Sequence, residues 1–257
     1  PEDYDSWAEA GNTEWSFEKT LPYFRKLETD LDYSGDFHGN DGPIIARRYK
    51  KEDWLPSQIA FYEGCKALGF PDGEDQNNPD VSGVGATPFN NPNGIRWSTS
   101  IGYLSMSRHR LNLTIRPNCL TQKIVFEGKR AVGVKVESEG ETFVVEGETI
   151  ILSAGAVSSP HILMLSGIGP SDQLTQQGIE VIHDLKGVGE EFQDHYAIRV
   201  ANRVKSLQTL NERGRGISLI WEILKWFATG KGLLAFSPAS VGAFIRSSPE
   251  ISRPDLQ

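Results

Sequence analysis

The segment TIILSAGAVSSPHILMLSGIGP, residues 149–170, limits the fold more than any other part of the chain. It opens on an apolar, β-branched run without alternation, which predicts a strand at 149–152 that is covered on both faces. Very small residues follow from Ser153 to Ala156. Because they offer almost no side chain for packing, they let a ligand come close to the backbone where the strand meets a helix.

The second half of this segment predicts the helix. Ser158 or Ser159 can cap it, and Pro160 suits its first position, where a missing amide hydrogen costs nothing. Gly167 is expected to end it. Free amides at a helix start favour an anion, so the turn before the helix is a candidate binding site for an anionic group.

Two interpretations of the small residues stay open at this point. In the first, Ala154 and Gly155 leave space for a ligand. In the second, Ala154, Gly155 and Ala156 only allow the helix to pack tightly on the strand. An isolated glycine-rich turn does not decide between them.

Composition excludes several classes of protein. The chain has 257 residues, of which 38% are hydrophobic and 23% charged, as in soluble globular proteins with one large domain or two smaller ones. The net charge is −8 and no dense Lys/Arg block occurs, so a nucleic-acid partner is not expected. Cys65 and Cys119 are the only cysteines and have no metal-ligand spacing, so we assign no metal.

The chain shows no apolar run near the roughly 20 residues of a membrane span and no leader pattern. We expect no membrane span and a cytoplasmic location. The chain begins at Pro1 without methionine and ends just after a strand-like VGAFIR, so we expect it to be cut at both ends.

The remaining pattern predicts a mixed α/β or α+β fold. Ala131 to Val136 and Glu141 to Val145 alternate apolar and polar residues around Ser138-Glu139-Gly140, which predicts an antiparallel hairpin with one wet face. The segment SGDFHGNDGP predicts a turn whose glycines, at 35, 39 and 42, are free to take positive φ. Further helices are expected twice within 1–30 and at 54–68, 98–110, 174–178 and 211–228; strands at 112–115, 121–126, 179–182 and 241–246; and a long surface loop at 71–94.

The full string GAVSSPHILMLSGIGP closely resembles a signature of the glucose-methanol-choline (GMC) flavoprotein oxidoreductases. The resemblance continues in family order over essentially the whole chain. It is carried by DYDSWAEAGNTEW, LPYFRKLE, DFHGNDGPI, GIRWSTSIGYL, NLTIRPNCLTQKIVFEGKRAVGV, DLKGVGEEFQDH and GKGLLAFSPASVGAFIRSSPEISRPDLQ. Together these blocks are similar to the choline-dehydrogenase-like alcohol dehydrogenases of the family.

The resemblance implies an FAD-binding domain combined with an antiparallel-sheet substrate domain. It assigns helices and a connecting loop of the FAD domain to 1–43 and a substrate-domain or lid segment to 44–97. It assigns a further part of the FAD-binding domain to 98–196 and a further part of the substrate domain to 197–257. The helix at 211–228 is then expected to form a wall or core of the substrate domain rather than a membrane face.

The resemblance also implies FAD as the cofactor and a small-molecule alcohol as the substrate, oxidised by hydride transfer to the flavin. The family's GxGxxG motif, which seats the FAD pyrophosphate, is absent from this chain. The family's catalytic histidine is expected beyond Gln257, so no catalytic residue is assigned here. We therefore expect the missing N- and C-terminal parts of the same protein to be needed for turnover.

The resemblance places three residues beside the cofactor. The residue at Thr121 is expected to lie beside the adenine through its backbone, and Ala154 and Gly155 are expected to approach the adenosine side of FAD. Asp194 and His195 invite a catalytic dyad, but adjacent residues on an extended chain point to opposite faces, which favours a structural role.

Rival functions follow from the same residues. The family fold also hosts lyases and a light-driven fatty-acid decarboxylase, so the fold alone does not fix the reaction. A flavin-free scaffold subunit is a second alternative. A serine hydrolase is disfavoured because no G-x-S-x-G elbow occurs. The sequence does not identify the alcohol or distinguish an oxidase from a dehydrogenase.

Overall fold

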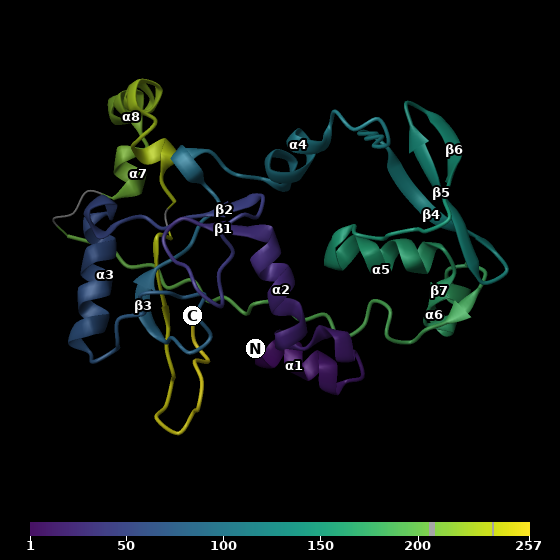
Figure 1. Cartoon of the computed structure of the whole chain (residues 1–257), viewed down its shortest axis with the longest axis horizontal. Helices are drawn as coiled ribbons and strands as arrows, with labels where there is room; N and C mark the ends of the chain where they lie inside the picture. Colours follow the sequence, from purple (N-terminus) through teal and green to yellow (C-terminus); the bar gives the residue numbers. More distant parts are fainter. Residues whose placement is uncertain (206–208, 238) are drawn as a thin grey trace. The chain divides into compact units, whose positions relative to one another are not determined.

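The computed structural model describes residues 1–205, 209–237 and 239–257 (Figure 1). They form two compact units. One unit combines Pro1–Leu113 with Asn202–Gln257, and the other is Thr114–Ala201. Helices and short strand pairs make up the first unit, and a three-stranded antiparallel sheet with two helices dominates the second. The mixed helix-and-strand class that the sequence predicts is confirmed.

The first unit begins with the two helices expected within residues 1–30. They are α1, Glu2–Glu9, and α2, Phe17–Leu27. Ser16 caps α2, because its hydroxyl oxygen accepts the amide hydrogen three residues later at 3.4 Å. The helices meet through the Tyr4 and Phe24 rings, whose centroids lie 5.5 Å apart.

The FHGNDGP turn folds back onto the end of α2. It connects β1, Glu28–Asp30, to β2, Ile44–Ala46, and the two strands pair in parallel. A Cβ at Gly39 would lie 2.0 Å from a carbonyl oxygen of α2, and one at Gly42 would lie 2.3 Å from the amide nitrogen that begins β1. Gly39 and Gly42 are therefore required because other backbone atoms lie close to them, and not because of a positive φ. Of the three glycines in the turn, only Gly35 has a positive φ, at 115°.

A small aromatic core stabilises the first unit. It lies where α3, Pro56–Ala67, packs beside β3, Gly83–Ala86, which pairs antiparallel with β9, Val241–Phe244. The expected helix and the expected late strand are confirmed within a few residues. The buried core residues are Tyr49, Trp54, Tyr62 and Val84.

The helix predicted at 211–228 is interrupted. It consists of α7, Leu210–Arg213, and α8, Gly216–Thr229. Gly216 has a φ of 57°, which is outside the right-handed helical region, so the chain breaks there. At the other end of α8, Gly230 has a φ of 66° and ends the helix in the usual left-handed conformation.

The second unit is built on the predicted hairpin. The strands β4, Leu120–Glu127, β5, Arg130–Ser138, and β6, Glu141–Glu146, pair antiparallel in sequence order. Glu139 and Gly140 form the tight connection with φ values of 54° and 83°. These positive values give the turn the twist that a two-residue hairpin needs.

The helix of the opening segment starts earlier than predicted. It is α5, Gly155–Leu165, so Pro160 lies inside it and is not its first residue. Ser159 still serves the helix start, since its hydroxyl oxygen accepts the amide hydrogen of Ala154 at 3.0 Å. The small residues at 154–155 therefore form the first turn of the helix itself.

The Ser-Gly pair after α5 attaches the helix to the sheet. The Ser166 hydroxyl accepts the amide hydrogen of Ile124 in β4 at 2.8 Å and donates to the Ile162 carbonyl at 2.5 Å. Gly167 has a φ of 85°, and a Cβ there would lie 2.4 Å from the Glu180 carbonyl oxygen. Both residues are thus explained by local structure.

The strand predicted at 149–152 is wrong. No described residue pairs with this segment, and the Ile151 side chain is 83% exposed. A buried strand needs neighbours on both edges, and none of the described strands provides one. The segment at 112–115 likewise forms no strand.

The helix predicted at 98–110 is reduced to a wide turn, Ser100–Leu104, followed by α4, Ser105–Ser107. The Ser105 hydroxyl donates to the Ser100 carbonyl at 3.1 Å, and such side-chain bonds compete with a regular helix. The helix predicted at 174–178 and the strand predicted at 179–182 lie at other positions in the structure. The elements observed there are α6, Ser171–Gln176, and a parallel pair of strands, β7, Ile168–Gly169, and β8, His183–Asp184.

No helix among residues 1–205, 209–237 and 239–257 is long and apolar enough to cross a bilayer.

Candidate functional site

The start of α5 is open to solvent. Ala154 and Gly155 are both exposed, and Gly155 has a φ of 88°. A Cβ built on Gly155 would meet no described atom within 4 Å. Within the described residues no packing contact requires a glycine at position 155, and open space over the first turn fits a ligand approaching the backbone.

The first amides of α5 have no acceptor within their own helix. They lie on exposed residues from Gly155 onwards, and an anionic group is the natural acceptor for them. The pyrophosphate-bearing dinucleotide expected from the sequence has this chemistry. The residues at this position thus fit FAD, as judged from exposure, backbone conformation and free donors.

Thr121 lies at the start of β4, in the same compact unit as α5. Its Cα is paired with that of Val136, and the register shifts between Thr121 and Lys123. Such irregularities leave backbone groups free of the ladder and often occur beside binding sites. No hydrogen bond within the described part of the chain joins Thr121 to Ala154 or Gly155, so their common site stays a prediction.

Asp194 and His195 do not form a catalytic dyad. Both are exposed, and the Asp194 carboxylate accepts the backbone amide hydrogen of His195 at 2.8 Å. Within the described residues the His195 ring has no hydrogen bond or ion pair. The geometry supports the structural interpretation over a general base.

Sequence reasoning missed a buried charge network centred on His38. His38 Nε2 lies 2.7 Å from an Asp75 carboxylate oxygen, and Nδ1 lies 3.2 Å from carboxylate oxygens of both Glu28 and Asp30. The Arg48 guanidinium contacts Asp30 at 2.8 Å and Asp75 at 3.0 Å.

The network favours charged side chains. Burial alone would lower the pKa of His38, but the hydrogen bond and charge of Asp75, together with Glu28 and Asp30, raise it on balance. Burial would raise the pKa of Asp30, but its bonds to Arg48 and to backbone amides lower it on balance. Both shifts hold the network in its ionised form.

The carboxylates of this network already have cationic partners. Glu28, Asp30 and His38 offer ligand atoms within 4.8 Å of one another, which is metal-like spacing. However, both carboxylate oxygens of Asp30 accept hydrogen bonds from the Arg48 guanidinium, at 2.9 and 2.8 Å. A cation beside this guanidinium would be repelled, so we interpret the cluster as structural. In the sequence, this cluster is indicated only by Glu28 and Asp30, the two acidic members that precede the FHG turn.

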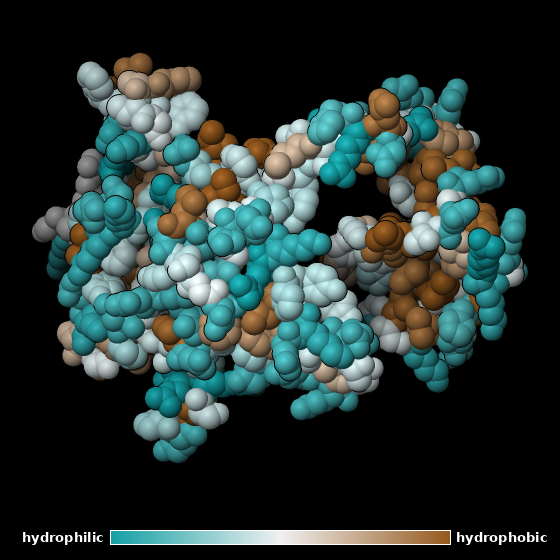
Figure 2. Space-filling model, in the orientation of Figure 1, coloured by the Kyte–Doolittle hydropathy of each residue, from teal (hydrophilic) through white to brown (hydrophobic). Residues whose placement is uncertain are grey.

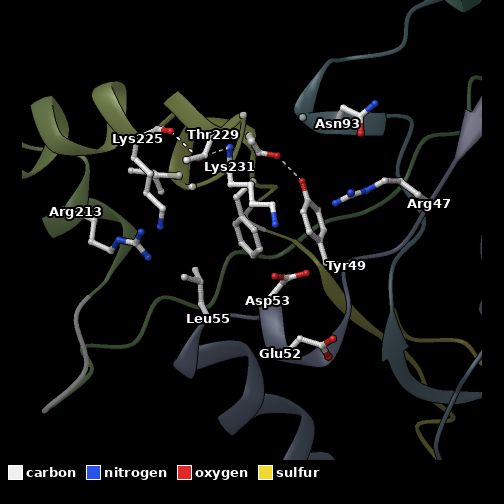
Figure 3. A pocket seen from close by; sticks show the side chains of 16 residues that line it. Arg47, Tyr49, Glu52, Asp53, Leu55, Asn93, Arg213, Lys225, Thr229 and Lys231 are labelled. Atoms are coloured by element: carbon white, nitrogen blue, oxygen red, sulfur yellow. Dashed lines mark hydrogen bonds between the residues drawn. The ribbon is translucent and has the colours of Figure 1, made fainter. Parts of the chain in front are cut away.

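A cavity of about 540 Å³ lies in the first unit (Figure 3). Lys225 and Lys231 extend into it from the end of α8, while Glu52 and Asp53 face them from the opposite wall. Tyr49 forms its inner side, where its hydroxyl donates to the Ala235 carbonyl at 2.5 Å. No histidine is among its described lining residues.

Comparison with known proteins gives concordant matches. A family model described as GMC oxidoreductase matches residues 1–197. An uncharacterised GMC-type oxidoreductase of Rhodococcus erythropolis is 42% identical over 193 residues, which is 75% of this chain and 38% of that protein. An oxygen-dependent choline dehydrogenase of Photobacterium profundum is 37% identical over 256 residues, which is 99% of this chain and 45% of the relative.

Among solved structures, an FAD-dependent oxidoreductase from Chaetomium thermophilum superposes with a TM-score of 0.76 at 27% identity, covering 91% of this chain and 43% of that one. The chain thus spans less than half the length of the proteins it matches. The family, the fold class and the flavoprotein relationship predicted from the sequence are confirmed.

Proposed function

The chain belongs to the GMC oxidoreductase family, and from this premise we propose that its protein is an FAD-dependent oxidoreductase that oxidises a small-molecule alcohol. The observation that carries the proposal is the 37% identity, over 99% of the chain, to an oxygen-dependent choline dehydrogenase. Because the chain spans 45% of that relative, the reaction belongs to the whole protein and is proposed as such.

The proposed contribution of this chain is to bind the adenosine side of FAD. Ala154 and Gly155 present almost no side chain at the start of α5, where free amides can donate hydrogen bonds to an anionic group. The Thr121 backbone, beside the register shift of β4, is proposed to contact the adenine. When bound, FAD supplies the hydride acceptor.

The general base is proposed to be a histidine beyond Gln257. Among the described residues, His38 is engaged in the charge network, and the exposed His195 ring has no hydrogen-bond partner. We also retain the domain assignment of 1–43 and 98–196 to the FAD domain and of 44–97 and 197–257 to the substrate domain. Residues 206–208 and 238 of the last segment lie outside the described residues.

A cytoplasmic location is proposed for the protein. Both cysteines, Cys65 and Cys119, are free thiols, which suits a reducing compartment.

The cofactor site is tested by Ala154→Leu. We expect the larger side chain to lower the FAD content of the purified protein about ten-fold, equivalent to about 1.4 kcal/mol of binding free energy. The free energy of unfolding of the apoprotein should change by less than about 0.5 kcal/mol, because Ala154 is exposed.

The matched control is Ala10→Leu, at an exposed position after α1. Flavin absorbance per protein is measured for both variants. Equal flavin content in the two variants would show that the start of α5 is not part of the FAD site.

A further inference from the structure

Residues 74–82 form a loop without regular secondary structure between α3 and β3. The loop is mainly polar, and none of its residues belongs to the described aromatic core. Figure 2 shows mainly teal and white surface around the lower part of α3, where the chain leaves the helix toward this loop. The contacts that hold loop 74–82 in place are therefore mainly polar.

Asp75 is the buried charged residue of this loop. One of its carboxylate oxygens lies 2.7 Å from His38 Nε2, and the other accepts a hydrogen bond from Arg48 Nη2 at 3.0 Å. Tyr33 adds a contact beside it, because its hydroxyl donates to the Glu74 carbonyl at 2.5 Å. Side chains of the segment 33–48 thus hold the start of the loop.

The His38 ring joins the loop to strand β1, because both of its nitrogens face carboxylates. Nε2 faces Asp75 in the loop, and Nδ1 lies 3.2 Å from oxygens of Glu28 and Asp30 in β1. An imidazolium donates from both nitrogens, whereas a neutral imidazole has one N–H and one lone pair. Only the protonated ring can therefore donate to both sides.

We propose that His38 is a pH-dependent latch, which holds loop 74–82 against β1 while both ring nitrogens carry a proton and releases the loop when one proton is lost. After that loss a lone pair faces a carboxylate. The three carboxylates of the network then share the Arg48 guanidinium as their cationic partner, and repulsion among them increases.

The loop is the part of the network that can move. Strand β1 is paired with β2, and the Asp30 carboxylate accepts two hydrogen bonds from Arg48. Loop 74–82 has no strand partner among the described residues. Gln76 keeps it attached to the sheet, because its side-chain amide donates to carbonyls of β3 and β9 at 3.2 and 2.8 Å. Release is therefore a local opening and not unfolding of the unit.

The other ionisable groups around His38 do not explain a change near neutral pH. The Tyr33 ring lies 6.0 Å away, and burial raises the pKa of its hydroxyl. Arg25 and Lys26 of α2 and Asp41 of the turn line the same shallow hollow as His38. Arginine, lysine, tyrosine and carboxyl groups ordinarily change charge outside the range in which histidine does.

The sign of the effect follows from the surroundings of His38. Burial would lower the pKa of His38, but Asp75, Glu28 and Asp30 raise it on balance. The loop should therefore be held below about pH 6.5, the ordinary value for histidine, and should open as pH rises through the higher folded value.

The test is hydrogen–deuterium exchange of the purified protein between about pH 5 and about pH 9, with each rate corrected for the intrinsic exchange rate at that pH. We expect the corrected rate of the peptide 74–82 to rise about ten-fold with pH, as for the loss of one hydrogen bond to a charged group. Peptides of the β5–β6 hairpin should show no such rise. In His38→Gln the rate in the loop should be high throughout.

The matched control is His109→Gln, which removes an exposed histidine without a hydrogen bond or ion pair in the described residues and should keep the parent profile. If His38→Gln does not fold, Asp75→Asn is the second variant, and its loop should exchange fast already at low pH. A pH-independent rate of the loop in the parent protein would overturn the proposal. A rise that persists in His38→Gln or Asp75→Asn, or an equal rise in the hairpin, would overturn it as well.

Discussion

At the scale of single residues, the charge network around Arg48 is the feature with the largest expected effect on stability. Arg48 is 7% exposed and neutralises Asp30 and Asp75. Arg48→Met should lower the free energy of unfolding by about 3–5 kcal/mol, because it leaves buried carboxylates without their partner. Lys51→Met removes the exposed pair with Glu63 and should cost less than about 1 kcal/mol. Urea denaturation of both variants measures the difference, and similar values would contradict the account.

The same network predicts a pH dependence. The folded-state pKa of His38 is raised by Asp75, Glu28 and Asp30, against the lowering by burial. Its stabilising contribution is therefore complete below about pH 6.5, the unfolded value, and is lost as pH rises through the folded value.

The free energy of unfolding should accordingly fall with increasing pH across this window, and His38→Gln should flatten the profile. Denaturation profiles of the parent and the variant at matched pH values provide the measurement. Parallel profiles for the two proteins would rule out His38 as the source.

At the scale of elements, the β5–β6 hairpin has a strained position. Glu139 adopts a φ of 54° in a two-residue turn before Gly140. Asparagine tolerates this conformation better than glutamate, and Asn-Gly is a preferred sequence for such turns. Glu139→Asn should therefore raise the free energy of unfolding by about 0.5–1 kcal/mol. The control is Glu148→Asn, because Glu148 does not have a positive φ and its replacement should leave the free energy of unfolding unchanged. Equal increases in the free energy of unfolding of the two variants would refute a specific effect at the turn.

The elements predicted correctly depend on local signals. The hairpin follows from alternation and turn residues, which lie within a few positions of one another in sequence. The strand predicted at 149–152 fails because its pairing depends on distant partners, which an apolar run does not specify. In the segment predicted as a helix at 98–110, the Ser105 hydroxyl donates to the Ser100 carbonyl, a local bond that competes with regular helix geometry.

At the scale of the whole molecule, local chemistry predicted an anion site near the start of α5, and family resemblance predicted FAD as its ligand. The open space around Gly155 is visible only in the structure. Asp75 contacts His38 although the two residues are 37 positions apart in the sequence. Long-range contacts and exposure had to come from the structure.

We propose that this chain is part of an FAD-dependent enzyme that oxidises an alcohol. The most direct measurement is the visible absorption spectrum of the purified protein before and after anaerobic addition of a panel of small alcohols that includes choline. We expect a flavin band that bleaches with at least one alcohol and returns when oxygen or an artificial electron acceptor is added. A flavin band that no alcohol bleaches, or a protein that binds no flavin, would contradict it.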